Sequence, residues 1–268
     1  MAKLTVGLLH PGEMGSAVGA CLTSVGLEVL WLPKGRSPST RMRAELSGMT
    51  PVGSMVEVTA RSSLILSICP PHAALDVARS LPDFKGTYVD ANAISPSLSE
   101  RVQVEVSTKG AKYVDGSIIG IPPTASGTTR LYLAGAESVA VAAIFDDTFL
   151  DARTMSAPPG AASALKMAYA AWTKGTAALL LAIRQLARDE EIEDALLNEW
   201  SISLPELPGK ADRAAIQAED KGWRWAGEMD EIASTFSAFG LPGGFHQAAA
   251  EVFRRGNVGL HELPPRSQ

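Results

Sequence analysis

The sequence predicts an α/β domain with a doubly wound, mostly parallel sheet, followed by an all-α domain. Three observations support this fold class. Short apolar runs typical of buried strands alternate with helix-like segments over the first half of the chain. The first run meets the first helix at a tight, glycine-containing turn, and beyond residue 160 the pattern is helical alone.

The size and charge of the chain define its broad class. Its 268 residues exceed the number that one domain commonly holds, so we expect two domains, at residues 1–157 and 158–268. The hydrophobic share of 46% is that of a globular protein. A net charge of −5 argues against binding to nucleic acid. No apolar stretch reaches the length of about 18 residues that a membrane span needs, so we expect no membrane association.

The two cysteines, Cys21 and Cys69, lie far apart in apolar surroundings. Their spacing fits neither a disulfide framework nor a metal site, so we expect buried reduced thiols and no metal. The first residues lack the charged and apolar regions of a secretory signal. Together these features predict a cytoplasmic protein.

The first strand, helix and second strand are predicted within about 30 residues, the length of a βαβ unit. Residues 4–9 are mostly apolar, as in a strand buried on both faces. Residues 14–22 carry small and apolar side chains at helical spacing, and residues 28–32 form the second apolar run.

The alternation continues along the chain and predicts a parallel sheet with right-handed crossovers. Further strands are expected at residues 64–68, 87–90, 112–115 and 130–134, with helices at 72–81 and 96–108. After Pro158 we expect one long helix over 161–191, then helices near Asn198 and over 210–240 and 244–256. Residues 262–268 are expected to fray.

The turn after the first strand has the position of a glycine-rich dinucleotide fingerprint. Gly12 lets a pyrophosphate approach the backbone, Gly15 lets the helix pack close to the strand, and the helix N-terminus offers free N–H groups. The usual first glycine is His10 here, and an ordinary tight turn is the alternative. The pattern favours a Rossmann-type domain, with cofactor contacts from His10, Pro11, Gly12, Glu13 and Met14.

The loop after the second strand indicates which dinucleotide is bound. It contains no acidic residue to bind the ribose of NAD, but it contains Arg36, which can pair with a 2′-phosphate. We therefore expect NADP, with NAD less suitable, and contacts from Gly35, Arg36, Ser37 and Thr40. The alternative is a solvated basic loop.

Two later strand ends reach the same edge of a parallel sheet, where ligands bind. We expect Cys69, Pro70 and Pro71 to line the nicotinamide ribose. Asn92 is expected to hydrogen-bond the cofactor or the substrate, and the alternative is a turn residue that bonds its own backbone.

Lys166 lies among small and apolar residues of the long predicted helix. Lys166, Tyr169 and Thr173 are three and four residues apart, so they share one helix face. A partly desolvated lysine there would have a lowered pKa and could exchange protons near neutral pH. By position alone, a snorkelling surface lysine is the alternative.

The chain resembles the β-hydroxyacid dehydrogenase family, which includes 3-hydroxyisobutyrate and 6-phosphogluconate dehydrogenases. Four segments carry the resemblance: residues 7–15, which end Gly-x-Met-Gly; 89–96, a strand-end motif; 114–120, at the substrate motif; and 160–166, at the catalytic lysine. Residues 223–232 look like a branch with a divergent C-terminal domain. The resemblance implies hydride transfer between nicotinamide C4 and a hydroxyl-bearing carbon, with Lys166 as general acid–base.

The resemblance also implies the substrate contacts, which are Asn92, Ser117, Ile118, Ile119, Gly120 and Tyr169. Ile119 stands where the family has a serine, and Tyr169 stands where it has an asparagine. A buried, unpaired carboxylate beside Ile119 would be costly, so we expect a bulkier or less polar small-molecule substrate. Trp172, Trp223 and Trp225 could add aromatic contacts, with core or dimer packing as the alternative. A second family lysine is missing, and Gly227 or Glu228 takes its position.

Two other functions remain open at this point. Imine reductases share the architecture but usually lack the lysine, so the lysine favours C–O over C=N chemistry. A non-catalytic NADP-binding protein is the second alternative, since a fold can outlive its function. We also expect a homodimer through the apolar helical domain.

Overall fold

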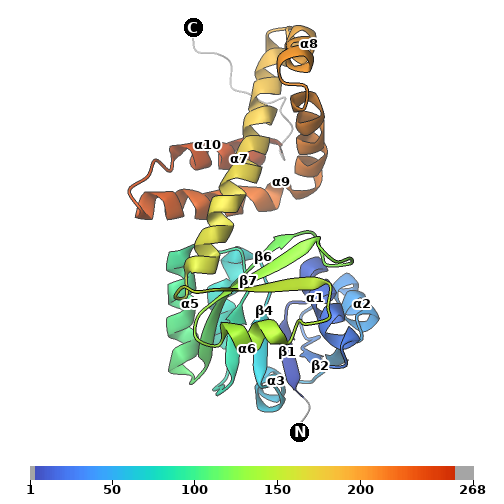
Figure 1. Cartoon of the computed structure of the whole chain (residues 1–268), viewed down its shortest axis with the longest axis vertical. Helices are drawn as coiled ribbons and strands as arrows, with labels where there is room; N and C mark the ends of the chain where they lie inside the picture. Colours follow the sequence, from blue (N-terminus) through green and yellow to red (C-terminus); the bar gives the residue numbers. More distant parts are fainter. Residues whose placement is uncertain (1–3, 257–268) are drawn as a thin grey trace. The chain divides into compact units, whose positions relative to one another are not determined.

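The computed structural model describes residues 4–256, so the expected fraying of residues 262–268 lies outside the described part (Figure 1). The chain forms two compact units, the first ending at Lys166 and the second beginning at Met167. The division falls within the long helix α7 (Ala161–Asp189), later than the expected boundary at residue 157. The last strand ends at Met155, before both of these positions.

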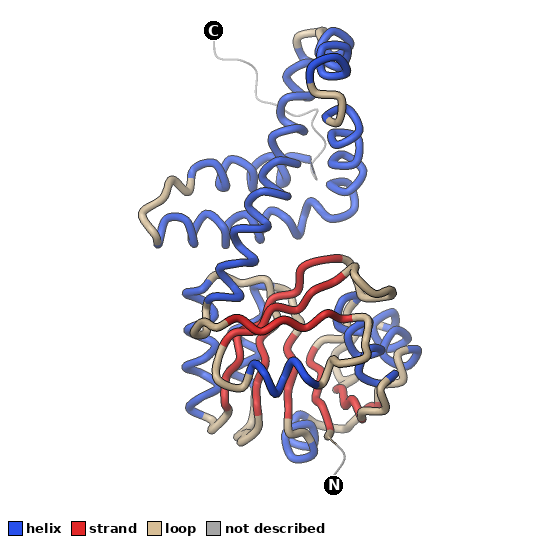
Figure 2. Tube along the Cα trace, viewed as in Figure 1, coloured by secondary structure: helices blue, strands red, loops and turns tan. Residues whose placement is uncertain are grey.

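The first unit is built on one eight-stranded sheet (Figure 2). Its strands are β1 (Thr5–Leu9), β2 (Glu28–Trp31), β3 (Thr50–Pro51), β4 (Leu64–Ser67), β5 (Thr87–Asp90), β6 (Lys112–Gly120), β7 (Thr129–Ala134) and β8 (Leu150–Met155). The order is β3-β2-β1-β4-β5-β6-β7-β8, and every neighbouring pair is parallel except β6–β7. The predicted doubly wound, mostly parallel sheet is confirmed.

Helices cover both faces of this sheet. They are α1 (Glu13–Ser24), α2 (Pro38–Leu46), α3 (Met55–Arg61), α4 (Ala74–Ser80), α5 (Pro96–Thr108) and α6 (Ser138–Ala143), with a short 3₁₀ turn at Pro71–Ala73. One apolar core contains Val18 and Leu22 of α1 and Val141 of α6. The other contains Val58 of α3 and Val102 of α5. The central strands β1, β4 and β5 are therefore buried on both faces, which explains their continuous apolar patterns.

Several elements of the first unit were not predicted, and each has a weak apolar pattern. Helix α2 buries only Ala44, so it shows no amphipathic stripe. Strand β8 is an edge strand with a charged, partly exposed sequence, which sequence periodicity does not distinguish from a loop. Strand β6 continues to Gly120, beyond the expected residues 112–115, because it pairs with the antiparallel β7.

In the second unit, as far as residue 256, α7 is followed by α8 (Glu193–Ser203), α9 (Leu207–Ala238) and α10 (Gly244–Gly256), with no strand. The main core holds Met167, Trp225, Met229, Ile232 and Phe253. The rings of Trp225 and Phe253 meet edge to face, with centroids 5.3 Å apart. The predicted all-α region is thus observed over the described residues.

None of the helices between residues 4 and 256 combines the length and the apolar character that crossing a membrane requires.

Candidate functional site

The turn between β1 and α1 has the geometry of a dinucleotide-binding loop. His10 adopts a positive φ of 65°, which the first glycine of such a loop usually supplies. A Cβ on Gly15 would lie 2.5 Å from the His10 carbonyl oxygen, so the helix packs too closely for any other residue. A Cβ on Gly12 would meet no atom within 4 Å. The backbone of Gly12 is therefore exposed to open space at the start of α1, where an anion is favoured.

The strand order places this turn at the topological switch of the sheet. Strand β1 lies between β2 and β4. The chain adds β2 and β3 on one side of β1, then crosses over and adds β4 and the later strands on the other side. The carboxyl ends of parallel strands at such a point form the crevice where open α/β sheets bind ligands. His10 follows β1, Arg36 lies in the loop after β2, and Cys69 follows β4.

Electrostatic interactions show that these three residues are neighbours. Burial, and then the Arg36 charge, lower the pKa of His10 to about 4. Burial and Asp90 raise the pKa of the Cys69 thiol to about 12, with a smaller opposite effect from Arg36. Both ring and thiol are thus neutral at pH 7. Within residues 4–256, buried His10 Nδ1 and Arg36 Nε have no hydrogen-bond partner.

The rest of the loop after β2 presents hydroxyl groups beside Arg36. Ser37 caps α2, accepting from the Thr40 backbone N–H at 3.2 Å and donating to Thr40 Oγ1 at 3.1 Å. Gly35, with φ of 76°, provides the bend that precedes this cap. Ser37 is exposed and Thr40 half-buried. The residue types and the unpartnered polar atoms fit a phosphate-bearing nucleotide.

Asn92 ties the ends of β4 and β5 together. Its Oδ1 accepts from the Cys69 backbone N–H at 2.5 Å, and its Nδ2 donates to Ser67 Oγ at 3.2 Å. Its own N–H donates to Asp90 Oδ1 at 3.0 Å. The side-chain amide therefore bonds the end of β4 and not its own backbone, and a direct contact with cofactor or substrate stays a prediction. Pro70 is exposed, and Pro71 begins the 3₁₀ turn.

Lys166 is held against the expected substrate segment of β6. Its Nζ donates to the Ile118 carbonyl oxygen at 2.7 Å. Ser117 and Ile119 are buried, and Ser117 Oγ has no hydrogen-bond partner in the described part of the chain. Gly120 has a φ of 133° and closely approaches the backbone of Thr128. The lysine is therefore half-buried and bonded inside the unit instead of extending into solvent.

Two buried acids near this segment were not singled out from the sequence. Asp115, fully buried on β6, accepts hydrogen bonds from the first turn of α7. Asp90 at the end of β5 is 1% exposed, and its burial, with help from Asp115, raises the pKa of the carboxyl to about 7. The sequence did contain a signal, because an acid inside an apolar strand is costly unless something binds it.

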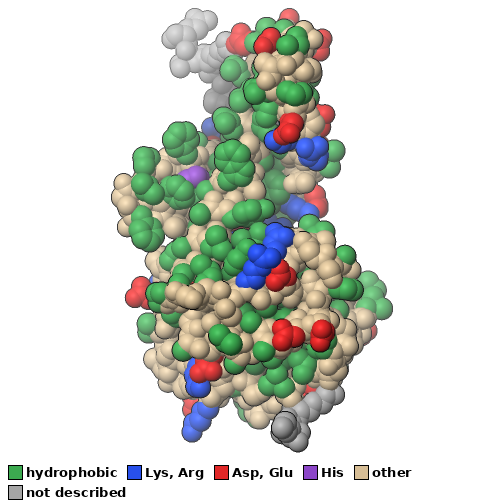
Figure 3. All heavy atoms as spheres, in the orientation of Figure 1, with side chains coloured by type: hydrophobic (Ala, Val, Ile, Leu, Met, Phe, Trp, Pro, Cys, Tyr) green, Lys and Arg blue, Asp and Glu red, His purple; other side chains and the backbone are tan. Residues whose placement is uncertain are grey.

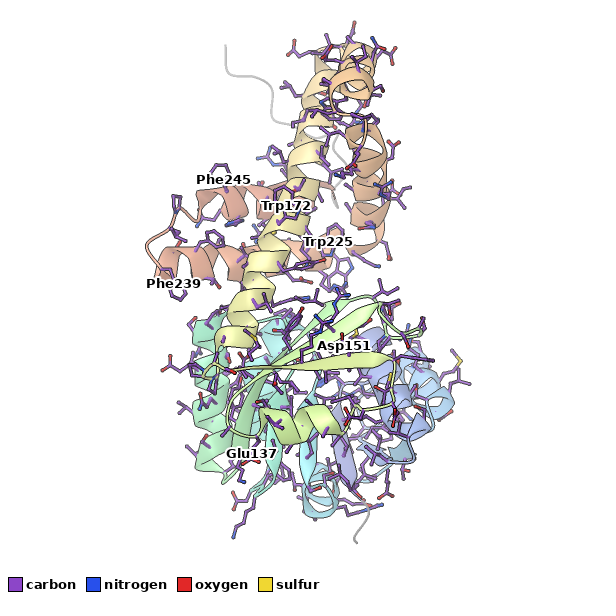
Figure 4. The ribbon with its side chains drawn as sticks, in the orientation of Figure 1. Glu137, Asp151, Trp172, Trp225, Phe239 and Phe245 are labelled. Atoms are coloured by element: carbon purple, nitrogen blue, oxygen red, sulfur yellow. The ribbon has the colours of Figure 1, made fainter. Side chains whose placement is uncertain are left out.

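The aromatic residues considered as substrate contacts belong to the second unit. Trp225 is buried in the helical core, which favours the packing interpretation for this residue. Tyr169, Trp172 and Trp223 are exposed. Figure 4 shows Trp172 on α7 and Trp225 on α9. Glu228, one of the two residues considered for the position of the absent family lysine, is buried and forms an ion pair with Lys174 of α7.

In the described residues, no group of three or more His, Cys, Asp or Glu side chains is arranged to hold a metal ion.

Comparison with protein families and curated proteins gives three matches. Residues 187–256 match a family described as a domain of unknown function, DUF1932. An uncharacterized 28.5 kDa protein of Methanothermus fervidus is 27% identical over 208 residues, covering 77% of this chain and 78% of that protein. The mitochondrial 3-hydroxyisobutyrate dehydrogenase of Drosophila melanogaster is 24% identical over 149 residues, which cover 53% of this chain and 45% of that enzyme.

Solved structures share the fold over almost the whole chain. A 3-hydroxyisobutyrate dehydrogenase of Mycobacterium tuberculosis superimposes with a TM-score of 0.72 at 17% identity, covering 94% of this chain and 93% of its own. A reductive aminase of Aspergillus terreus, in complex with NADPH and ethyl levulinate, has a TM-score of 0.62 at 17% identity, with coverage of 96% and 95%. The expected resemblance to β-hydroxyacid dehydrogenases is confirmed, and the fold is that of 3-hydroxyacid dehydrogenase-like proteins.

Proposed function

We propose that this protein is an NADP-dependent oxidoreductase that transfers hydride between the nicotinamide and the carbon of a hydroxyl or carbonyl group, with Lys166 as the general acid–base. The observation that carries the proposal is the hydrogen bond from Lys166 Nζ to the Ile118 carbonyl at 2.7 Å. It holds an amine beside the substrate segment of β6, in the same compact unit as the glycine turn.

The cofactor part of the proposal rests on the turn after β1 and the loop after β2. The open space at Gly12 and the N-terminus of α1 suit a pyrophosphate. Arg36, with Ser37 and Thr40 beside it, suits a 2′-phosphate, and no acid occupies this loop. When bound, the nicotinamide would supply or accept the hydride. The likeness to a reductive aminase solved in complex with NADPH supports the same cofactor class.

Lys166 would handle the proton of the reaction. In the oxidative direction its neutral amine accepts the proton of the substrate hydroxyl, and in the reductive direction its ammonium returns that proton to the carbonyl oxygen. The Ile118 carbonyl accepts from either form, so it holds Nζ in one place in both protonation states.

The substrate would be bulkier or less polar than a small hydroxy acid. Ile119 is buried on β6 and offers no donor to a carboxylate, while Ser117 offers a buried hydroxyl two residues earlier on the same face. A carboxylate left unpaired against Ile119 would lose its hydration without compensation. A direct role for Tyr169 stays a prediction.

The alternative with a specific observation in its favour is imine reduction, because the chain shares its fold with the reductive aminase of Aspergillus terreus. Retention of a lysine at position 166 favours C–O chemistry over this alternative. A non-catalytic NADP-binding protein would bind the dinucleotide and transfer no hydride.

A comparison of Lys166→Met with wild type tests the proposal. Both proteins are given NADPH and a panel of carbonyl and imine substrates, and NADPH oxidation is followed with product analysis. We expect carbonyl reduction by wild type and a loss of at least about 100-fold in kcat for the variant, with an unchanged NADPH dissociation constant. Lys112→Met, the same substitution at an exposed lysine of β6, is the matched control.

Three outcomes would contradict parts of the proposal. Near-normal turnover by a folded Lys166→Met protein removes the lysine from the reaction. Turnover of imines alone selects the imine reductase. NADPH binding without oxidation by any member of the panel selects the non-catalytic protein.

We further propose that the protein is a cytoplasmic homodimer that associates through its helical unit. Trp172, Leu179 and Leu186 of α7 are 75%, 60% and 59% exposed and lie seven residues apart, which places them on one stripe. Figure 3 shows hydrophobic side chains on the visible surface of the helical unit. The two buried, unbridged cysteines fit a reducing compartment.

A further inference from the structure

Asp115 is a fully buried carboxylate whose bonds lead to the helix that carries Lys166. It lies in the middle of β6, flanked by Val114 and Gly116, and its side chain has no solvent contact. An ionised carboxylate in such a place is costly unless its oxygens are saturated with donors.

Both oxygens of Asp115 accept hydrogen bonds, mainly from the start of α7. Oδ2 accepts from the backbone N–H groups of Gly160 at 2.8 Å and Ser163 at 3.0 Å. Oδ1 accepts from the hydroxyls of Ser163 at 2.6 Å and Ser99 at 3.3 Å. The carboxylate thus caps a helix from a neighbouring strand, where the partial positive charge of the helix N-terminus favours it.

A second bond joins the same strand to the same helix. Ile118, three residues beyond Asp115 on β6, accepts from Lys166, three residues beyond Ser163 on α7. Three strand residues advance about 10 Å, and three helix residues advance about 4.5 Å. The long lysine side chain spans the difference. Strand and helix are therefore joined at two points whose spacing is set by their own geometry.

This arrangement fixes the rotation of α7 as well as its position. A slip of one residue along the helix would turn each side chain by about 100° and move Lys166 away from Ile118. The Ser163 side chain and backbone both bond Asp115, so neither a shift nor a rotation of the first turn preserves the contacts. Gly160, with φ of 96°, lets the chain enter the helix at this angle.

We propose that Asp115 is a positioning residue, which fixes the first turn of α7 on β6 and so sets where the Lys166 amine stands for proton transfer. This inference rests on the proposed function of Lys166. It assigns Asp115 no contact with substrate or cofactor. Its role is exerted through Ser163 and Gly160 on the helix that carries the lysine.

The test uses the full chain with NADPH and compares three variants. Asp115→Ala removes all four acceptor contacts. Asp115→Asn keeps an oxygen for the two backbone N–H groups, and the serine hydroxyls can turn to accept from its amide. Ser163→Ala removes one hydroxyl bond but keeps the backbone bonds. Asp151→Ala, an exposed acid on β8 paired with Arg153, is the control.

Three quantities are measured for each variant below its melting temperature: kcat, the NADPH dissociation constant, and the titration of the Lys166 side chain. The titration is followed by the ¹³Cε NMR signal of labelled lysine, assigned by its absence in Lys166→Met. We expect Asp115→Ala to lose about 10- to 100-fold in kcat, because small misplacements of a catalytic group have large effects. Its NADPH dissociation constant should change less than twofold, and its Lys166 signal should shift.

The conservative variants separate positioning from folding. We expect Asp115→Asn to stay within about fivefold of the wild-type kcat, and Ser163→Ala to lie between Asp115→Asn and Asp115→Ala. If Asp115→Ala does not fold, the Ser163→Ala protein must still show the lowered kcat and the shifted lysine signal. Wild-type kcat and an unmoved Lys166 signal in Asp115→Ala, or in Ser163→Ala where the alanine variant does not fold, would overturn the inference.

The same measurements distinguish this inference from the proposed function. If Lys166→Met is fully active, the proposed function fails, and the lysine signal still reports whether Asp115 positions the amine. If Lys166→Met is inactive while Asp115→Ala is unaffected, the proposed function stands and the inference on Asp115 fails.

Discussion

At the scale of single residues, His10 shows how this chain departs from a glycine-rich fingerprint without losing its shape. Its backbone takes the left-handed conformation of the missing glycine, and its ring is kept neutral by burial and by Arg36. A non-glycine residue there has a strain that the surrounding turn must offset. His10 and Arg36 therefore lie close together, and their interaction could not be read from their spacing in the sequence.

Arg36 should determine the preference of the protein for NADPH over NADH. A charge-assisted bond to a 2′-phosphate contributes about 1.5–3 kcal/mol, so Arg36→Ala should weaken NADPH binding by about 10- to 100-fold. NADH lacks that phosphate, and its dissociation constant should change less than about threefold. Both constants are measured by nucleotide fluorescence, with the exposed Arg101→Ala as control. Equal losses for NADPH and NADH would reject Arg36 as the phosphate-binding residue.

Asp90 should make the stability of the protein depend on pH in an unusual direction. Burial raises its pKa to about 7 from an ordinary value near 3.8, so between these values the folded state binds more protons than the unfolded state. Its contribution to stability is therefore complete below pH 4 and is lost as the pH rises to about 7. Asp115 faces it and adds to this effect, while the Asn92 N–H opposes it.

Asp90→Asn removes this titration and resembles the protonated acid. The unfolding free energy of the variant relative to wild type should rise between pH 4 and pH 8, by an amount on the order of a few kcal/mol. Guanidinium unfolding at several pH values measures the difference, with the exposed Asp151→Asn as control. A constant difference across this range would contradict the expectation.

At this scale, residues whose role depends on the local backbone were predictable from the sequence. Residues whose role depends on a hydrogen-bond partner far away in the sequence were not. The tight turn at Gly12 and Gly15 follows from the glycine pattern, whereas the role of Lys166 came from the family resemblance and stays a prediction. Asp115 meets its partners 45 and 48 residues later in the chain, so no local pattern identifies them. Its only signal was an acid inside an apolar run.

At the scale of elements, the sequence predicts a helix or strand well when burial imposes a period. Strands β1, β4 and β5 are buried on both faces and were recognised as continuous apolar runs. Helix α3, with one buried residue over seven, and the edge strand β8 were missed. Their formation depends on neighbours in the sheet and on end caps such as Ser54, which accepts from the Glu57 N–H.

The buried ion pair between α7 and α9 gives an element-scale prediction. Lys174 and Glu228 have side chains only 13% and 9% exposed, and Glu228 also lies 3.6 Å from Arg224. Glu228→Leu leaves Lys174 buried without its partner and should lower the unfolding free energy by about 3–5 kcal/mol. Lys174→Met should cost less, because Arg224 remains beside Glu228.

The double variant Lys174→Met/Glu228→Leu completes this experiment. It removes both buried charges, so it should recover most of the stability lost in Glu228→Leu. Urea unfolding, followed by tryptophan fluorescence, gives the four free energies of the cycle. Additive losses would show that the two side chains do not interact.

At the scale of the whole molecule, the chain combines an α/β sheet unit with a helical unit that exposes large apolar side chains. Figure 4 shows Phe239 at the end of α9 and Phe245 on α10, which are 70% and 82% exposed. Together with the stripe of Trp172, Leu179 and Leu186, they leave apolar surface that a second copy would cover.

The proposed dimer should therefore depend on that stripe. Wild type is expected to sediment at twice the mass of the chain, and Trp172→Glu/Leu179→Glu is expected to sediment as a monomer. Leu46→Glu, at an exposed apolar position of α2 in the first unit, should leave the dimer intact. Analytical ultracentrifugation makes the measurement, and a dimeric double variant would exclude this surface as the interface.

The two glycines of the first turn are under different constraints. A methyl group at position 15 collides with the chain itself, whereas one at position 12 touches nothing. The fold itself therefore requires glycine at position 15, whereas only a ligand in the crevice would require glycine at position 12. Loss of the proposed coenzyme would remove the constraint on position 12 but not the one on position 15, so the residue at position 12 would indicate whether the crevice is still in use.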